Sequence, residues 1–480
     1  MKRSRALFAT AVGGALLMCG SAGATAWPQP NGDVRGTRAT ADTAISSRTV
    51  AGLTVRWRFL LPPGSPFGSF ASTPVVRDGT VYLQTLASSV YALDASTGRI
   101  RWRWLQRAPN DGPNGLAVTA TRVYGATDTS VFALDRRTGR RIWAKRLVSR
   151  TQQFVDIAPL VADGLVFTST VGFPPGGRGA LYALDARTGR IRWRFETIRD
   201  PWLHPSAGGG GAWYTPSLGA GGVLYVGISN PDPWGGTRLR PNGGAFPGPT
   251  PYTDALVALR ARTGKLIWYD QVRRHDVRDY DFEASPIVVG NSVYGAGKAG
   301  RVVAWNRLTG RRLWSQAVGT HLHDLGPLPA RPTLVCPGLW GGVLTPMAYA
   351  HGRLFVPVVE RCMRESAVTT PAPADLRSGN GLVTALAAAT GTKLWTRHLG
   401  SPATGCTTVA NDVVFAPTLD GRLYGLAASS GRVLWETRTP AGINSCPAVS
   451  GDLLIVGAGA PRQGGGPREV LAYGVGAGRP

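Results

Sequence analysis

Residues 181–193 read LYALDARTGRIRW, and close variants of this string recur along the whole chain. The string begins with a short apolar and aromatic run, which is typical of a strand. Thr188 and Gly189 then form a turn signal, because glycine adopts a positive φ angle without steric cost. The residues after this turn form a second strand that ends at Trp193. The string therefore predicts an antiparallel pair of strands.

Another pair of short strands precedes each string, as in TPVVRDGTVYLQT at 73–85. Four strands in a unit of roughly 40–50 residues are typical of a β-propeller blade. We predict an all-β, eight-bladed β-propeller of four-stranded blades. The reason is that the last strand of the repeated string ends on a tryptophan at eight places along the chain. These are Trp57, Trp102, Trp143, Trp193, Trp268, Trp314, Trp395 and Trp435.

The repeated tryptophans are predicted to pack between blades, where a large aromatic surface stabilises most. Only the last strand of a unit is present at Trp57, near the start of the chain. We therefore expect this strand to pair with EVLAYGV at 469–475, so that one blade is built from both ends of the chain. Such closure protects the strand edges that an open sheet would leave exposed.

The first residues resemble a secretory signal peptide. Lys2, Arg3 and Arg5 precede a short apolar run, and 24–26 (Ala-Thr-Ala) is a small-x-small cleavage site. The apolar run is too short to span a membrane. We expect a signal peptide at 1–26 and a single propeller domain at 27–480. The mature chain would be exported, without a transmembrane segment, to a periplasmic, extracellular or cell-envelope location.

Four cysteines follow the expected cleavage site, and an exported protein can keep disulfides. Three pairings are open, and the sequence alone does not choose between them. Nearness along the chain favours Cys336–Cys362 and Cys406–Cys446. The net charge is +25, but the arginines are scattered, many of them beside the repeated turn. Nucleic-acid binding is therefore not indicated, whereas an anionic cell envelope or acidic partner proteins fit the charge better.

The stretch QVRRHDVRDYDFEASP at 271–286 concentrates carboxylates in a chain that has only 28 acidic residues. It lies directly after Trp268, at the end of an interval of 75 positions that begins at Trp193. Trp314 and Trp395 are 81 positions apart. Blades do not need such lengths, and long loops on a rigid scaffold commonly carry function.

Two interpretations of this acidic stretch remain open. Asp279 and its neighbours could form solvated ion pairs with Arg273, Arg274 and Arg278. Surface ion pairs contribute only about 0–1 kcal/mol, so stability alone explains this density poorly. The alternative is a site that needs a base.

The repeat Ala-x-Asp-x-x-Thr-Gly-x-x-x-Trp resembles the signature of the pyrroloquinoline quinone (PQQ) propellers, the quinoprotein alcohol dehydrogenases. The resemblance covers nearly the whole mature chain, although the repeat also occurs in the outer-membrane assembly lipoprotein and in other binding propellers. More specific matches are GGGAWYTPSLGAGGVLYVGISNPDPW at 209–234, HDVRDYDFEASPIV at 275–288 and GKAGRVVAWNRLTG at 297–310.

This resemblance implies a site. Asp279 matches the catalytic base that takes the alcohol proton as hydride leaves for the quinone. Asn230 matches a ligand of the Ca²⁺ ion that polarises the quinone carbonyl. Trp213 matches the tryptophan on which the quinone lies, and Lys298 matches the cation that contacts the quinone oxygens. The implied cofactors are PQQ and Ca²⁺. Because the chain has no Cys-x-x-Cys-His haem site, the electron acceptor would be separate, such as a cytochrome c.

The chain also departs from the pattern of that family. Pro174 stands where a second metal ligand, a glutamate, is usual, and Asn114 stands where a quinone-binding arginine is expected. No adjacent cysteine pair is present. Val277 replaces the extra acid of lanthanide-dependent members, which favours Ca²⁺, and His275 is interpreted as structural. These departures support an alternative function, a non-catalytic propeller that acts as a binding or assembly scaffold in the cell envelope.

Overall fold

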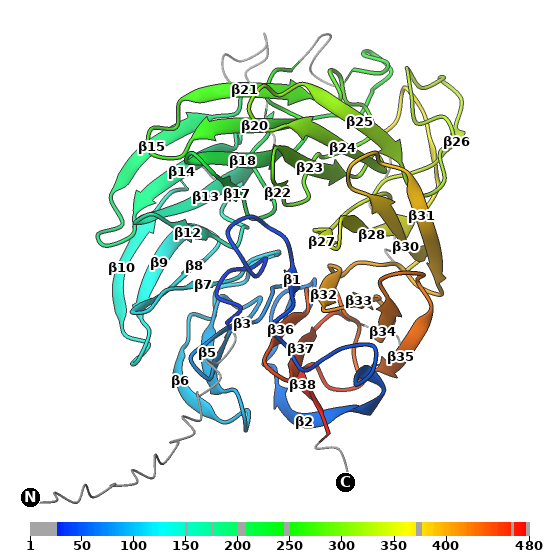
Figure 1. The fold of residues 1–480 in the computed structure, drawn as a ribbon. Coiled ribbons are helices and arrows are strands. Elements are labelled where there is room, and N and C mark those ends of the chain that lie inside the picture. Colours follow the sequence, from blue (N-terminus) through cyan, green and yellow to red (C-terminus); the bar gives the residue numbers. More distant parts are fainter. Residues whose placement is uncertain are drawn as a thin grey trace, which may run out of the picture.

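The computed structural model describes residues 26–148, 152–173, 176–198, 208–243, 250–370, 377–461 and 465–476. Within these ranges, eight antiparallel blades stand side by side around a ring, with the inner strands toward its axis (Figure 1). The predicted eight-bladed propeller is confirmed. Nearly all of the predicted signal peptide lies outside the described residues. Among the described residues, no helix has the length and apolar character needed to cross a membrane.

Each blade has four strands from the inner first strand to the outer fourth strand, and in all but the last blade these strands follow one another in sequence order. The first four blades are β3 (Val75–Arg77), β4 (Thr80–Gln84), β5 (Val90–Asp94) and β6 (Ile100–Trp104); β7 (Ala117–Val118), β8 (Arg122–Ala126), β9 (Ser130–Asp135) and β10 (Arg141–Arg146); β12 (Leu160–Ala162), β13 (Leu165–Gly172), β14 (Ala180–Asp185) and β15 (Ile191–Glu196); and β17 (Ser217–Gly219), β18 (Val223–Ile228), β20 (Ala255–Arg260) and β21 (Leu266–Gln271).

The next four blades repeat this order. They are β22 (Ile287–Val289), β23 (Ser292–Gly297), β24 (Arg301–Asn306) and β25 (Arg312–Ala317); β27 (Ala348–Ala350), β28 (Arg353–Glu360), β30 (Asn380–Ala387) and β31 (Lys393–Leu399); β32 (Thr408–Ala410), β33 (Val413–Pro417), β34 (Arg422–Ala427) and β35 (Val433–Arg438); and β36 (Ala448–Ser450), β37 (Leu453–Ala458), β38 (Glu469–Val475) and β2 (Leu53–Leu60).

The last blade closes the ring as predicted. Strand β2, which contains Trp57, pairs antiparallel with β38, and Trp57 lies opposite Ala472. The short 3₁₀ helix η1 (Val50–Gly52) precedes β2, and β1 (Ala39–Thr40) adds a parallel strand to β32. Chain segments from the two ends therefore share one blade and its neighbour.

The inner strands are buried on both faces, while the outer strands alternate between exposed and packed residues. Trp193 on an outer strand donates its Nε1–H to the carbonyl of Ala261 in the next blade, at 2.8 Å. Gly264 of that blade has φ +67°, and a Cβ placed on it would lie 2.6 Å from the Trp193 ring. The same stacking of a tryptophan on the next Thr-Gly or Ser-Gly turn recurs at Trp57, Trp102, Trp143, Trp268, Trp314 and Trp395. The predicted packing of tryptophans between blades is confirmed.

We expect Gly264→Ala to lower the free energy of unfolding by about 1–3 kcal/mol. Alanine would be strained at positive φ, and its methyl group would displace the Trp193 ring. Gly79 is a matched control, because it also has φ +67° but nothing lies within 4 Å of its Cβ position. Denaturant unfolding should show a larger loss for Gly264→Ala than for Gly79→Ala, and equal losses would contradict a packing role for this glycine.

The ends of the ring differ. At one end, which we call the long-loop mouth, the second strand of each blade connects to the third and the fourth strand leads to the next blade. The two long intervals add short sheets there, β16 (Gly208–Gly209) with β19 (Pro231–Asp232) and β26 (Thr333–Val335) with β29 (Met363–Glu365). Strand β11 (Gln153–Phe154) extends the third blade at the same mouth.

Both disulfides favoured by nearness along the chain are present. Cys336 pairs with Cys362 and thereby ties the ends of β26 and β29 together. Cys406 pairs with Cys446, which links the segments that lead into the seventh and eighth blades. The first of these bonds holds the second long interval in place over the long-loop mouth.

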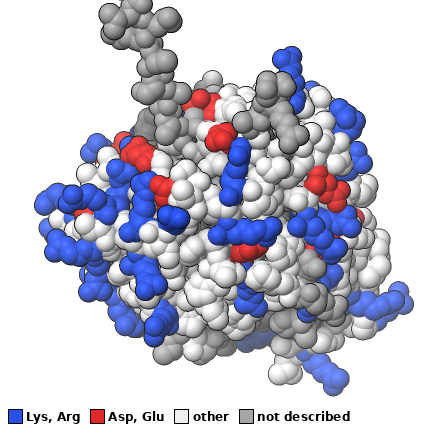
Figure 2. All heavy atoms as spheres, turned by 90° about the horizontal axis from the view of Figure 1, so that it is seen from below, with Lys and Arg blue, Asp and Glu red and all other residues white. Residues whose placement is uncertain are grey.

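Basic side chains are spread over the outside of the ring. The repeated turns carry exposed arginines such as Arg99, Arg140 and Arg190. In Figure 2, Lys and Arg are dispersed over the face shown, with Asp and Glu between them. Part of this charge is paired within a blade, as in Arg101–Asp94 at 2.7 Å and Arg192–Asp185 at 2.7 Å.

Candidate active site

Three of the four predicted site residues meet at the long-loop mouth. Asn230 follows β18, Lys298 follows β23, and Asp279 lies between β21 and β22. The Asn230 Nδ2 atom donates to Asp279 Oδ1 at 3.0 Å, and Lys298 Nζ donates to Asp279 Oδ2 at 2.8 Å. The Asp279 side chain is 15% exposed and that of Lys298 is 10% exposed. Each oxygen of the Asp279 carboxylate is thus held by one polar side chain.

Asp281 completes this arrangement. Its Oδ1 accepts the backbone N–H of Asn230 at 2.8 Å, and its Oδ2 lies 2.5 Å from Lys298 Nζ. Lys298 therefore bridges two carboxylates, and Asp281 fixes both partners of Asp279. The sequence placed Asp281 in the acidic stretch, but nothing local identified it as the residue that positions Asn230 and Lys298.

The site holds more buried acid than one lysine balances. Burial raises the pKa of Asp279 to about 8, against the opposing effect of Lys298 and with a further rise from Asp281. Burial likewise raises the pKa of Glu283 well above its usual range. For Lys298, burial lowers the pKa, but Asp279, Asp281 and Glu283 outweigh it and raise the pKa well above the usual value. Lys298 is therefore charged within an acidic cluster.

The backbone turns Asp279 toward these partners and away from the arginines. Asp279 adopts φ +60°, and the Asp276 carboxylate accepts the N–H groups of Arg278 and Tyr280 at 3.1 and 2.8 Å. Arg278 donates to the His323 carbonyl. In the described ranges, no ion pair joins Asp279 to Arg273, Arg274 or Arg278. For Asp279, the structure therefore does not show the solvated ion pairs with these arginines, and the partners of its carboxylate are Asn230 and Lys298.

Trp213, the fourth predicted residue, lies in the loop between β16 and β17 at the same mouth. Its ring packs against Phe154 and Phe173, with centroid distances of 5.9 and 6.4 Å. Its Nε1–H is buried without a hydrogen-bond partner. The ring of Trp213 packs on aromatic neighbours and makes no direct contact of this kind with Asn230, Asp279 and Lys298 in the described part of the chain.

Tyr214, beside Trp213, is a residue that the sequence did not single out. Burial raises its pKa, Glu283 and Asp156 raise it further, and Arg38 and Lys298 oppose them. Its hydroxyl is therefore within electrostatic reach of the acidic cluster and of a second acid, Asp156. Neither Tyr214 nor Asp156 carries a recognisable local motif, and only the folded ring brings them together.

The residues at which the sequence departs from the family pattern have other roles. Asn114 donates its Nδ2–H to the Thr85 carbonyl at 3.0 Å, while its Oδ1 is buried without a partner. Val277 packs in a small apolar cluster with Leu328, Val335 and Ala367. His275 Nε2 lies 2.6 Å from the Asn242 carbonyl, a structural contact. Pro174 lies outside the described residues.

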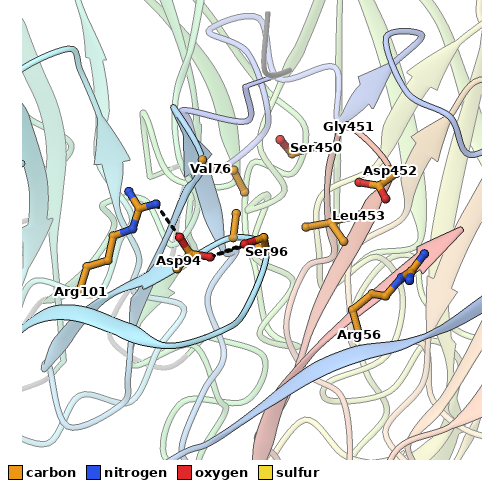
Figure 3. A pocket seen from close by; sticks show the side chains of 11 residues that line it. Arg56, Val76, Asp94, Ser96, Arg101, Ser450, Gly451, Asp452 and Leu453 are labelled. Atoms are coloured by element: carbon orange, nitrogen blue, oxygen red, sulfur yellow. Dashed lines mark hydrogen bonds and ion pairs between the residues drawn. The ribbon is translucent and has the colours of Figure 1, made fainter. Parts of the chain in front are cut away.

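A cavity of about 550 Å³ lies elsewhere, at the opposite end of the ring between the first and last blades. Figure 3 shows Arg101 paired with Asp94 on one side of it and Arg56 near Asp452 on the other. The predicted site residues do not line this cavity. It is therefore a feature separate from the candidate active site.

The chemistry of the candidate site suits the implied cofactors. Asn230 and Asp279 offer hard oxygen donors, which Ca²⁺ prefers, and the excess of buried carboxylates would be balanced by a divalent cation. The half-buried indole of Trp213 suits a flat ring. The described part of the chain holds no group of three or more His, Cys, Asp or Glu side chains arranged around a metal position, so an amide oxygen and a cofactor would have to complete the coordination.

A family model described as "Outer membrane protein assembly factor BamB" (PQQ_2) matches residues 22–147, 111–335 and 379–474. Quinohemoprotein alcohol dehydrogenase ADH IIB of Pseudomonas putida is 31% identical over 246 residues, which is 45% of this chain and 35% of that protein. The quinohemoprotein alcohol dehydrogenase of Comamonas testosteroni is 30% identical over 312 residues, 58% of this chain and 43% of that protein. The chain thus spans less than half the length of these relatives.

Solved structures share the fold. The crystal structure of the Comamonas testosteroni quinohemoprotein alcohol dehydrogenase superposes with a TM-score of 0.81 at 24% identity, over 95% of this chain and 81% of that one. A europium-containing methanol dehydrogenase superposes with a TM-score of 0.77 at 20% identity, over 94% of this chain and 98% of that one. BamB from Moraxella catarrhalis superposes with a TM-score of 0.56 at 15% identity, over 88% of this chain and 99% of that one. At these identities the likeness concerns the fold alone.

Proposed function

Because the chain belongs to the PQQ_2 family of β-propellers, we propose that it is a PQQ-dependent dehydrogenase that oxidises an alcohol. The observation that carries this proposal is the buried Asp279 carboxylate, held by Asn230 on one oxygen and by Lys298 on the other. Burying a charged carboxylate costs free energy of folding. Buried acids with perturbed pKa values therefore occur mainly at functional sites, and a binding scaffold does not require one at this mouth.

Each residue has a distinct role in this proposal. Asp279 is the base that accepts the hydroxyl proton of the alcohol. Lys298 and Asn230 orient its carboxylate, and Asp281 positions both of them. Burial at the long-loop mouth limits the access of water, which strengthens these interactions.

The cofactors would be held by the same residues. Asn230 and Asp279 would supply oxygen ligands to Ca²⁺, Trp213 would offer a face to the PQQ ring, and Lys298 would supply a positive charge near its oxygens. When bound, PQQ supplies the electron-accepting chemistry that side chains lack. Electrons would leave to a separate acceptor such as a cytochrome c. The signal-peptide-like start supports export to the periplasm, the exterior or the cell envelope.

The direct test is a titration of the purified protein with PQQ in the presence of Ca²⁺. We expect saturable 1:1 binding, followed by tryptophan fluorescence and quinone absorbance. Trp213→Ala and Asn230→Ala should weaken binding because they remove the ring contact and a metal ligand. As a control, the Asn291→Ala variant is changed at an exposed residue at the opposite end of the ring. It should bind PQQ with the same affinity as the parent protein. No binding at micromolar PQQ would reject the proposal and favour the scaffold function.

A further inference from the structure

The repeated turns place basic side chains at one end of the ring. In the first seven blades the turn between the third and fourth strands lies opposite the long-loop mouth, at the end that we call the turn end. One or two positions after the glycine of each turn stands an exposed basic residue. These seven residues are Arg99, Arg140, Arg190, Lys265, Arg311, Lys393 and Arg432. The fold thus repeats one cation from blade to blade around the ring.

Acids in the turns do not neutralise these cations. Asp94 pairs with Arg101 at 2.7 Å, and its Oδ1 also accepts the backbone N–H of Thr97. Asp185 pairs with Arg192 at 2.7 Å. From the fourth blade on, the residue at this place in the turn is no longer acidic. Within the described ranges, the seven cations form no ion pair.

The other exposed charges at the turn end do not cancel this excess. The hairpins between the first and second strands add four exposed acids, which are Asp78, Asp163, Asp412 and Asp452. The turns themselves add four more exposed bases, which are Arg137, Arg141, Arg187 and Arg262. Because these two groups offset each other, the charge of the seven repeated cations remains.

Exposed aliphatic side chains stand directly after basic residues, where the outer strands begin. They are between 36% and 46% exposed, and they are Ile100, Ile142, Leu266, Leu313 and Leu394. Large aliphatic side chains are usually buried. Basic residues combined with exposed apolar ones are typical of surfaces that bind the interface of an anionic membrane. The turn end therefore offers groups both to charged headgroups and to the apolar boundary beneath them.

We propose that the turn end binds the surface of an anionic phospholipid membrane. The inference goes beyond the proposed function and does not depend on it. The guanidinium group of arginine binds a phosphate through two parallel hydrogen bonds, which fits the headgroup of a phospholipid. The long-loop mouth lies at the other end of the ring, so a bound molecule presents its candidate active site away from the lipid.

The distribution of the cations favours a flat partner. A soluble acidic protein covers only about 800 Å² of its partner in a typical complex, and it would meet only part of the ring. The turn end repeats its cation in seven blades, and an extended flat surface can meet all of them at once. Several weak electrostatic contacts then add up, since each basic residue near an anionic membrane contributes separately.

The experiment measures binding to lipid vesicles by flotation. The protein is the chain of residues 27–480, which contains all eight blades. The predicted signal peptide is left out because its basic and apolar residues would bind vesicles by themselves. We expect binding to vesicles of phosphatidylglycerol with phosphatidylcholine, and none to phosphatidylcholine alone. High salt should release the protein, because salt screens the attraction between exposed charges.

A triple variant tests the turn end itself. Arg140→Glu, Arg190→Glu and Arg311→Glu together reverse the charge at three turns. Each basic residue contributes about fivefold to the affinity for an anionic membrane, so this variant should bind at least about 100-fold more weakly. The Ile142→Ser and Leu313→Ser double variant should also bind more weakly, with an unchanged dependence on salt, because it removes apolar surface only.

A matched control makes the same change in net charge near the long-loop mouth. It combines Arg238→Glu, Arg240→Glu and Arg331→Glu, all at exposed residues, and it should keep most of the parental affinity. Denaturant unfolding of every variant shows whether the fold is intact. Because the vesicle assay needs no cofactor, failure of PQQ to bind would reject the proposed function alone.

Three outcomes overturn the inference. The first is equal binding to anionic and to neutral vesicles. The second is an equal loss of affinity in the two triple variants, which would make binding a matter of net charge rather than of the turn end. The third is displacement from the vesicles by an equal charge concentration of soluble polyglutamate, which would assign the turn end to an acidic protein.

Discussion

Asp279→Asn is expected to lower kcat/KM for PQQ-dependent alcohol oxidation by about 10²- to 10⁴-fold, the usual contribution of a positioned base. The amide has nearly the same shape as the carboxylate and can still accept from Lys298, but it cannot take the proton of the alcohol. Asparagine is also among the residues that tolerate a positive φ, so the backbone at φ +60° is expected to survive. The effect should therefore fall on the reaction rather than on the fold.

The measurement is a rate assay with a panel of alcohols and an artificial electron acceptor, after loading with PQQ and Ca²⁺. Asp452→Asn is a suitable control, because Asp452 lines the cavity at the opposite end of the ring. We expect it to retain parental rates. If Asp279→Asn binds PQQ and still oxidises alcohols at the parental rate, the base is a different residue.

Lys298→Met should lower the free energy of unfolding by about 3–5 kcal/mol, as expected when one partner of a buried ion pair is removed. Asp279 and Asp281 would lose the cation that lies within 2.8 Å of both. Methionine fills similar volume, so the loss would come mainly from charge. Because burial raises the pKa of Asp279, the variant should be least stable at high pH and should recover as the pH falls and a proton neutralises this carboxylate.

Denaturant unfolding at several pH values tests this expectation. Adding Asp281→Asn to Lys298→Met should restore part of the lost stability, because it removes one of the stranded charges. Lys265→Met, an exposed change, should have little effect at any pH. A Lys298→Met protein whose stability is unchanged would show that the cluster holds protons rather than an ion pair.

The fold could be predicted because its information is local and repeated. One string of strand, Thr-Gly turn and tryptophan specifies the outer half of a blade, and the stacking of Trp193 on Gly264 shows why both residues recur. Closure through β2 and β38 followed from the incomplete unit at Trp57. The disulfide pairing was favoured by nearness but needed the structure to decide it.

The site could be predicted only in part. Ordered matches identified Asn230, Asp279 and Lys298, and the structure brings them into contact. The sequence could not show that Asp281 holds two of them, because its contact with Asn230 spans 51 residues and its contact with Lys298 depends on where β23 ends in the folded blade. Asp156 and Tyr214 were missed for the same reason. Loops from different blades converge only after the ring forms, so no short pattern records their contacts.

Ring closure also bears on how the protein is made. Leu53 pairs with Val475, so the contact that completes the last blade joins the first described strand of a blade with the last one. Pairing at such a separation raises contact order and slows folding. During synthesis the earlier blades can assemble while β2, whose partner β38 has not yet been made, keeps an unpaired strand edge. The ring can therefore close only after β38 has been synthesised, and until then the unpaired β2 edge is where a nascent molecule is most open to aggregation or to capture by a chaperone.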